Sequence, residues 1–264
     1  MAESAGSLFR AGKLTEAVAA ASAAVKAAPG DLAARVLLAE LLLFAGNIER
    51  ADVILDAAAD IDPQAAMVVA EFRQLLRAET ARRQLRRDGR VPEFLGEPTP
   101  TMQLALAVQV AVRAGDFAEA AKQAAALEET RPRAAGTHDG TPYDDFRDAC
   151  DLHVGFFEVL TTTGKYFWVP TEQVISAEFH KPERPRDLAW RRVTMSVREG
   201  PDGVVYIPAI YGSDVPDLAD KLRLGRETDW QEQEGFTRGL GQRVFLVGDD
   251  PATVMELGTL EFGS

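Results

Sequence analysis

The chain has 264 residues, of which 46% are hydrophobic and 27% charged, proportions typical of a globular protein with one large domain or two smaller ones. Its net charge of −12 argues against general nucleic-acid binding, because neutralising phosphates requires a concentrated basic surface. No apolar stretch approaches the ~20 residues of a membrane-spanning helix, and the first residues lack a secretory signal. We therefore expect a cytoplasmic protein that does not insert into membranes.

The first half contains three copies of a motif in which Ala-Gly is followed, after four residues, by alanine. The copies are Ala11–Ala17, Ala45–Ala51 and Ala114–Ala120, and the prolines that follow each glycine by 17 positions are Pro29, Pro63 and Pro132. The pattern predicts helix–turn–helix units in which the glycine ends the first helix in a left-handed conformation and the proline follows the second helix.

The repeat length identifies the kind of array. The glycines of the first two copies, Gly12 and Gly46, are 34 positions apart, which is the period of tetratricopeptide repeats. The interval from Gly46 to Gly115 is 69 positions and predicts a degenerate unit between them. The units lack the large aromatic residues of typical tetratricopeptide repeats, so we expect divergent copies. Stacked helix pairs commonly hold a partner's peptide or helix, which favours binding over catalysis.

An arginine row lies in the predicted degenerate unit. Its members are Arg82, Arg83, Arg86, Arg87 and Arg90. Their spacing places most of them on one side of a helix, where they are either solvated and locally paired or available to an acidic partner.

Turn-forming residues between Arg131 and Pro142 predict the domain boundary. We expect helical repeats in residues 1–135 and a small antiparallel β-rich domain in residues 136–264, which together make an α+β fold. Apolar residues at helical spacing predict that the second domain begins with a helix over Tyr143–Leu160. Turn residues between Arg90 and Thr101 link two helical units, with Thr101 expected to cap the next helix.

Beyond Gly164 the apolar period becomes alternating, which predicts strands. One hairpin is expected to pair Val193–Val197 with Val204–Ile207, and a second to pair Val244–Val247 with Met255–Phe262. Strands are also expected at Tyr166–Val169 and Val174–Phe179, giving a twisted sheet or partly closed barrel.

The sequence contains no recognisable catalytic motif. A Gly-x-Ser-x-Gly elbow is absent, and the three histidines fall in unrelated contexts. Cys150 and His153 lie close together but provide only a partial metal site. We therefore expect no catalytic residues, no cofactor and no metal.

A cluster of arginine, tryptophan and aspartate stands out in the second half. Such residues form either a structural clamp, through bidentate ion pairs and stacking on indole rings, or anchors for a partner. The candidates are Trp168, Arg186, Asp187, Trp190, Arg191, Tyr211, Arg226, Asp229, Trp230 and Arg243. Within this cluster Asp187 is expected to pair with Arg191, and Asp229 with Arg226.

Several motifs in these segments carry a family resemblance. They are Leu95–Pro98, Gly136–Gly140, Gly164–Pro170, Arg184–Trp190, Pro208–Tyr211, Arg226–Trp230 and Gly239–Arg243. With these motifs in this order, the chain resembles the ImpE/TagJ (SciE-type) accessory proteins of bacterial type VI secretion systems. The resemblance implies a cytoplasmic, non-enzymatic adaptor that binds the N-terminal helix of the small contractile-sheath subunit and influences sheath assembly or disassembly. A helical array that holds a helix agrees with that expectation.

Two other functions stay open. One is an enzyme of unknown reaction with a polar site around Asp187, Arg191, Arg226 and Asp229. The other is a scaffold that recruits a partner by strand addition to its second half. The sequence leaves the oligomeric state open.

Overall fold

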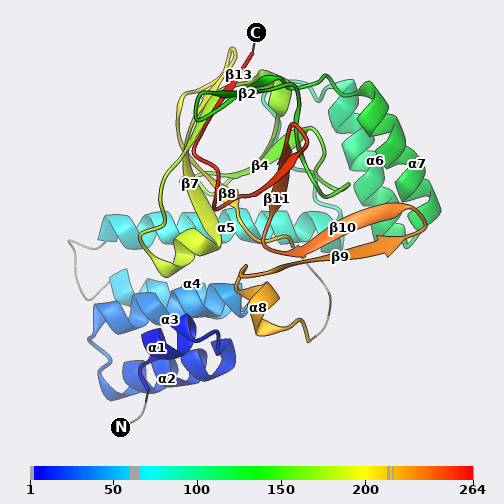
Figure 1. Ribbon diagram of the computed structural model, residues 1–264. Helices are drawn as coiled ribbons and strands as arrows, with labels where there is room; N and C mark the ends of the chain where they lie inside the picture. Colours follow the sequence, from blue (N-terminus) through cyan, green and yellow to red (C-terminus); the bar gives the residue numbers. More distant parts are fainter. Residues whose placement is uncertain (1–2, 60–65, 213–214, 216, 264) are drawn as a thin grey trace.

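The computed structural model describes residues 3–59, 66–212, 215 and 217–263. Its first half is helical and its second half is built from antiparallel strands (Figure 1). The helices of the first half are α1 (Ala5–Arg10), α2 (Leu14–Ala27), α3 (Leu32–Phe44), α4 (Ile48–Ala59), α5 (Ala66–Asp88), α6 (Pro100–Ala114) and α7 (Phe117–Thr130). The predicted α+β fold with a tetratricopeptide-like helical region is confirmed.

The repeat glycines end their helices as predicted. Gly12, Gly46 and Gly115 have φ values of 82°, 81° and 76°, the left-handed region in which a Cβ atom is unfavourable. Pro29 follows α2 and Pro132 follows α7, whereas Pro63 lies outside the described residues. The glycine and proline spacing therefore predicted the turns of the array correctly.

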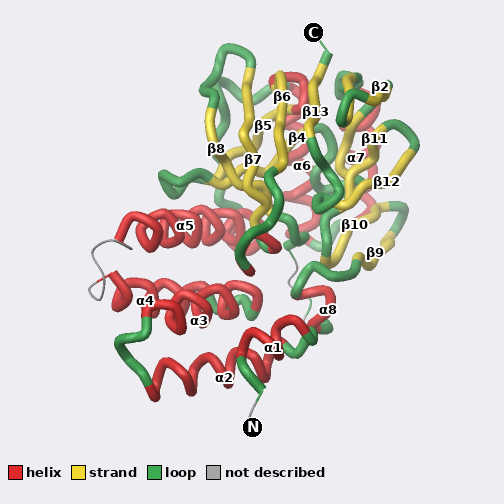
Figure 2. The backbone as a smooth tube through the Cα atoms, turned by 60° about the vertical axis from the view of Figure 1, so that its left-hand side comes forward, coloured by secondary structure: helices red, strands yellow, loops and turns green. Residues whose placement is uncertain are grey.

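The degenerate unit consists of the long helix α5 and an irregular segment. Helix α5 packs on α4 on one side and on the β-rich half on the other (Figure 2). The pair α6–α7 lies beside the β-rich half, apart from α1–α4 (Figure 1). The predicted cap at Thr101 is wrong, because Thr99 Oγ1 accepts the Met102 N–H at 3.2 Å and Pro100 begins the helix.

The second half contains short and medium strands. They are β1 (Gly136–His138), β2 (Thr141–Tyr143), β3 (Phe146–Asp148), β4 (Phe156–Leu160), β5 (Tyr166–Pro170), β6 (Val174–Phe179), β7 (Trp190–Val197), β8 (Gly203–Pro208), β9 (Thr228–Gln233), β10 (Phe236–Gly241), β11 (Val244–Val247), β12 (Asp250–Thr253) and β13 (Thr259–Phe262). Short helical turns are η1 (Thr171–Gln173), η2 (Pro185–Leu188) and α8 (Asp220–Arg223).

The main sheet has the order β2-β1-β13-β6-β7-β8-β4-β5 and curls around its own core (Figure 1). Smaller sheets pair β12-β11-β3 and β10-β9. The predicted hairpin of β7 and β8 is confirmed, as are the strands β5 and β6.

Two sequence predictions for this half are wrong. The segment Tyr143–Leu160 is not a helix: it contains β3, a turn and β4. All five residues of β4 are buried, so the strand lacks the polar alternation that would have marked it. In the second hairpin, β11 pairs with β12 across Gly248 and Asp249, while β13 joins β1 and β6.

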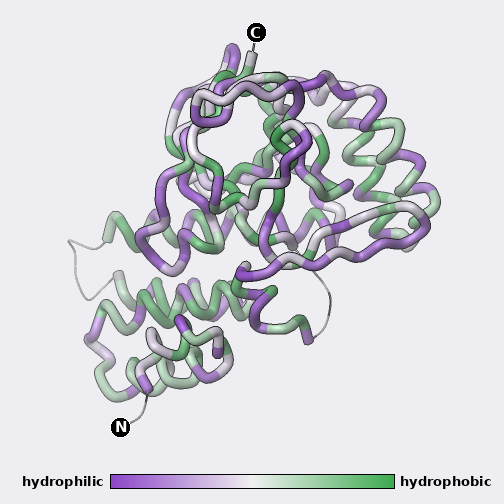
Figure 3. Tube along the Cα trace, viewed as in Figure 1, coloured by the Kyte–Doolittle hydropathy of each residue, from purple (hydrophilic) through white to green (hydrophobic). Residues whose placement is uncertain are grey.

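The largest hydrophobic cluster crosses from the helices into the β-rich half. It joins Phe72 and Leu76 of α5 to Trp168, Trp190 and Tyr206 of the strands. Figure 3 shows apolar colours along α3 and on the strands inside the curled sheet, where a second cluster lies. None of the helices in the described ranges is long and apolar enough to cross a membrane.

Candidate functional site

Polar side chains line the contact between the two halves, which we call the seam. Its first part lies at the ends of two helices. We call Asp220–Arg226 the clasp segment. Its Arg223 donates to the Ala45 carbonyl at 3.1 Å, and its Arg226 donates to the Arg10 carbonyl at 2.9 Å. These carbonyls lie at the C-terminal ends of α3 and α1, where helices present unpaired acceptors and partial negative charge. The clasp therefore caps two consecutive repeat units.

A buried carboxylate, Glu158 of β4, holds the centre of the seam. Arg82 of α5 binds it through two nitrogens at 2.9 and 3.1 Å, Arg243 forms a second ion pair, and the Tyr166 hydroxyl donates to it at 2.5 Å. Burial acts to raise the pKa of Glu158, but the charges of Arg82 and Arg243 outweigh it and hold the pKa well below its usual range. Glu158 is therefore an anion, which the two arginines neutralise.

A second carboxylate, Glu79 of α5, organises the next part of the seam. It receives Arg83 Nε at 3.0 Å and the Trp190 indole N–H at 3.4 Å, while Arg83 also donates to the Gly46 carbonyl at 2.7 Å. Arg82 contacts it at 3.5 Å. Helix α5 is thus tied to β7 through Glu79 and to the α3–α4 turn through Arg83.

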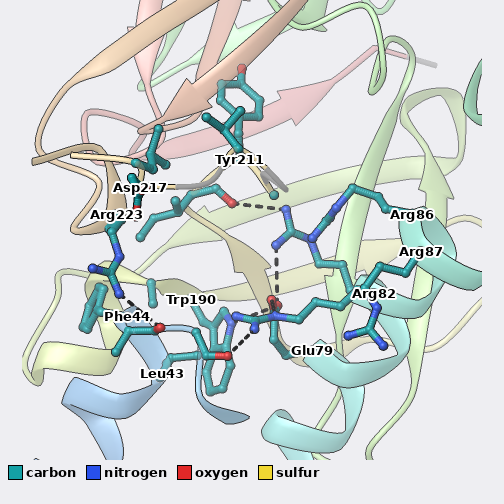
Figure 4. Close-up of a pocket in the computed structure, with 18 residues that line it drawn as sticks. Leu43, Phe44, Glu79, Arg82, Arg86, Arg87, Trp190, Tyr211, Asp217 and Arg223 are labelled. Carbon is teal, nitrogen blue, oxygen red and sulfur yellow. Dashed lines mark hydrogen bonds and ion pairs between the residues drawn. The ribbon is translucent and has the colours of Figure 1, made fainter. Parts of the chain in front are cut away.

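A cavity of about 450 Å³ opens beside Glu79, between α5, the α3–α4 turn and the chain that leads to α8 (Figure 4). Its charged lining consists of Arg82, Arg83, Arg86, Arg87, Arg223, Glu79 and Asp217. Figure 4 shows Arg82 and Trp190 directed toward Glu79. Local pairing is thus the correct interpretation for Arg82 and Arg83. Arg87 is exposed at the rim and makes no hydrogen bond or ion pair to the residues that the structure describes.

Most of the ten residues singled out from the sequence lie inside the protein. Trp168, Arg186, Trp190, Arg191, Tyr211 and Arg243 are buried, and the exposed positions are Arg226, Asp229 and Trp230, with Asp187 half-buried. Arg186 stacks on the Phe72 ring at 4.7 Å. The clamp interpretation fits the buried group, and partner binding by these residues stays a prediction.

The two ion pairs expected inside this cluster are wrong. Arg226 binds the end of α1, and Asp229 accepts the neighbouring Trp230 N–H at 2.9 Å. Arg191 contacts the Met255 sulfur at 3.8 Å, whereas Asp187 accepts backbone N–H groups of its own loop. The four residues of the enzyme alternative thus have separate partners and are not brought together.

The cysteine region holds a third polar residue that the sequence did not indicate. Asp148, Cys150 and His153 place one potential ligand atom each within 4.8 Å of one another. These groups already have partners in the core: Cys150 Sγ accepts the Gly239 N–H, and the Tyr211 hydroxyl donates to Asp148 at 2.7 Å. Burial lowers the pKa of His153 to about 3. We assign the cluster to core packing.

Comparison with known proteins identifies the chain's relatives. A family profile described as ImpE protein matches residues 140–261. Nearly half of the chain is thus similar to the ImpE family. A profile described as Tetratricopeptide repeat matches residues 8–72. These findings confirm the resemblance predicted from the motifs.

Two further similarities cover the helical half as well as the β-rich half. A protein from Pseudomonas aeruginosa named type VI secretion system accessory component TagJ is 29% identical, over 97% of this chain and 89% of that protein. A crystal structure of a Vibrio parahaemolyticus protein superimposes with a TM-score of 0.91 at 26% identity, covering 98% of this chain and 97% of the other. The arrangement of the two halves therefore recurs in a related protein.

Sequence reasoning missed the two carboxylates of the seam. Glu158 lies in Phe156–Leu160, within the segment mistaken for a helix, and Glu79 precedes the arginine row. A charged residue inside an otherwise apolar run was the available signal, because an ion at such a position requires a buried partner. The partner of Glu158, Arg82, lies 76 positions away and could not be identified.

Proposed function

We propose that this chain is a non-enzymatic adaptor of a bacterial type VI secretion system, working in the cytoplasm. It binds the N-terminal helix of the small contractile-sheath subunit and modulates sheath assembly or disassembly. The observation that carries this proposal is the match along nearly the whole chain to a TagJ protein, together with a helical-repeat region of the kind that holds peptides and helices.

The seam supports an adaptor that acts as one body. The ionisable groups whose pKa values are shifted there, Glu158 and His153, are buried and contact each other, and Glu158 is bound by Arg82 of the helical half. These groups therefore hold the two halves together. The two halves also share one hydrophobic cluster. Deleting either half would expose this cluster, so truncation would confuse loss of binding with loss of folding.

The clasp segment and η2 cover part of the helical half, which restricts where the partner's helix can bind. Among α1–α5, the β-rich half contacts α1, α3 and α5, and it reaches α2 at its first residue, Leu14, whose N–H donates to Asp220 at 2.9 Å. We place the partner helix on the other side of the stack, over α2 and α4. There Val53 of α4 is 66% exposed, an apolar side chain suited to an amphipathic helix.

The test uses the full chain and the purified small sheath subunit, with and without its first helix. We expect roughly micromolar affinity by calorimetry, which corresponds to about −8 kcal/mol. Equal binding after deletion of the helix would overturn the proposal.

A pair of surface variants tests the binding face. Val53→Asp should weaken binding by about tenfold or more, because an anion replaces an apolar contact. Val110→Asp is the matched control, since Val110 is 54% exposed on α6, away from α2 and α4. If both variants bind alike, the partner lies elsewhere, and the helix-deletion result still decides the proposal itself.

A further inference from the structure

The ribbon of β9 and β10 has one covered edge and one open edge. Gln242 N–H donates to the Glu227 carbonyl, which makes these two residues a hydrogen-bonded pair next to β9. Such pairs alternate along an antiparallel ladder, so Asp229, Gln231 and Gln233 bond to β10. The backbone groups of the residues between them point away from β10.

The outward groups of β9 belong to Thr228, Trp230 and Glu232. Within the part of the chain that the structure describes, the one hydrogen bond recorded for them is the Trp230 N–H to Asp229 Oδ1. The far edge of β10 is covered, because Thr237 exchanges bonds with Asp151. The other backbone donors and acceptors of this row have no recorded partner within the described residues, and such a row is a template for another strand.

Other strand edges are protected. The outer side of β5 is bonded to Glu93, β12 contains Pro251, and β2 and β3 have three residues each. By contrast, β9 has six residues and no proline. Figure 2 shows β9 at the periphery of the molecule. Among the described strands, β9 thus has an edge that is open to pairing with another strand.

The side chains of β9 indicate what would bind there. Trp230 is 38% exposed, and its ring lies 6.0 Å from that of Tyr211 in a tilted arrangement. Asp229 and Glu232 are exposed on the strand, and Glu234 follows it. The cations near these acids are Lys221, whose charge acts on Asp229, and Arg238, which donates to Gln231 at 2.9 Å. Figure 3 shows β9 in hydrophilic colours. The edge therefore combines main-chain bonding, an aromatic anchor and negative charge.

We propose that β9 accepts an extended basic segment of a partner protein as an added strand. A lysine or arginine of that segment lies beside Glu232, on the face of the ribbon that also carries Trp230, and a second lies three positions away beside Asp229 on the other face. The residue beside Trp230 is apolar. A second copy of this chain is a poor occupant, because it would place acidic side chains against each other. The site is independent of the proposed helix-binding face.

The test uses three synthetic ten-residue peptides and calorimetry with the full chain. The first has lysine at every third position with valine and threonine between, the second carries glutamate in place of lysine, and the third is the lysine peptide with N-methyl groups on its six central residues. We expect saturable binding of the first peptide only, because methylation removes the main-chain donors and glutamate reverses the charge.

Variants of the strand locate the binding. Glu232→Pro removes an outward donor and a charge, and Trp230→Ala removes the anchor; each should weaken the lysine peptide by about tenfold or more. Glu232→Gln keeps the donor and should mainly reduce the salt dependence. Asp250→Asn, an exposed acid on β12, is the matched control and should bind as the parent does.

Three results would overturn the proposal. They are no saturable binding of the lysine peptide, equal binding of the methylated or glutamate peptide, and a dimer of the chain that Trp230→Ala abolishes. Should Glu232→Pro lower the melting temperature, Trp230→Ala and the peptide controls still decide. Unchanged affinity of Glu232→Gln for the sheath helix would separate this site from the proposed function.

Discussion

Glu158 is buried between the guanidinium groups of Arg82 and Arg243, whose other carboxylate contacts are longer, at 3.5 Å to Glu79 and 3.4 Å to Asp148. Two buried cations beside one anion are stable only while the anion remains, since an uncompensated buried charge is costly. Glu158→Gln should therefore destabilise the protein by about 3 kcal/mol or more in urea unfolding followed by circular dichroism. The same change at Glu71, which accepts the Tyr206 hydroxyl at a half-buried position, should cost about 1 kcal/mol. Equal losses at both positions would show that the charge of Glu158 is unimportant.

The buried carboxyl group of Glu40, on α3, leads us to predict that the stability of the protein depends on pH. Burial raises its pKa to about 7, against the attraction of Arg186. The folded protein therefore holds a proton that the unfolded chain releases from about pH 4.5 upward, so this group lowers stability as the pH rises through that window. Glu40→Gln should stabilise the protein by about 2–3 kcal/mol at pH 8 and change little at pH 4.

The Glu40 prediction is measured by thermal unfolding at both pH values. Glu49→Gln, at an exposed position on α4, is the control and should show no such difference between them. A stabilisation by Glu40→Gln that is the same at pH 4 and pH 8 would contradict the assigned pKa.

At the scale of elements, local chemistry decided what the sequence could predict. Turns that need a glycine at positive φ were found, since Gly12 and Gly46 combine that requirement with a fixed period. The segment Tyr143–Leu160 was misassigned because β4 is buried on both faces and Gly155, at φ 81°, interrupts a spacing that imitates a helix. Less of the candidate site could be predicted from the sequence, because its ion pairs join residues that no local sequence pattern connects.

The turn between α6 and α7 gives a test of this local chemistry. A Cβ atom at Gly115 would meet no atom within 4 Å, so Gly115→Ala should lose only the backbone preference, about 1 kcal/mol. Gly30→Ala is the matched control, because its Cβ also has space and its backbone is not left-handed. Thermal unfolding should show a loss for the first and no loss for the second, and two equal results would contradict the role assigned to the glycine.

For the whole molecule, the shared hydrophobic cluster predicts one cooperative unfolding transition. Far-ultraviolet circular dichroism follows mainly the helices, whereas fluorescence follows Trp168 and Trp190 in the cluster. The two signals should change together across urea. Separate transitions would mean that the halves fold independently.

The sequence predicted two kinds of structure in the right order but not how closely they combine. The division at residues 135 and 136 stays a prediction, since the polypeptide changes from helix to strand there while the core crosses it. Docking of this kind depends on long-range pairs such as Arg82 with Glu158, which composition and periodicity do not reveal.

The clasp segment also restricts how this protein can evolve. Open helical solenoids gain or lose whole repeats with little penalty, because each unit contacts only its neighbours. Here Arg226 and Arg223, from one short segment, donate hydrogen bonds to the C-terminal ends of α1 and α3. These two helices are the first helices of consecutive repeats. Insertion of a further 34-residue repeat between α1 and α3 would move one of these helix ends too far away for its arginine to bind it. Repeat number between α1 and α5 should therefore be fixed among proteins that keep both arginines, with length changes confined to loops and to the chain before α1.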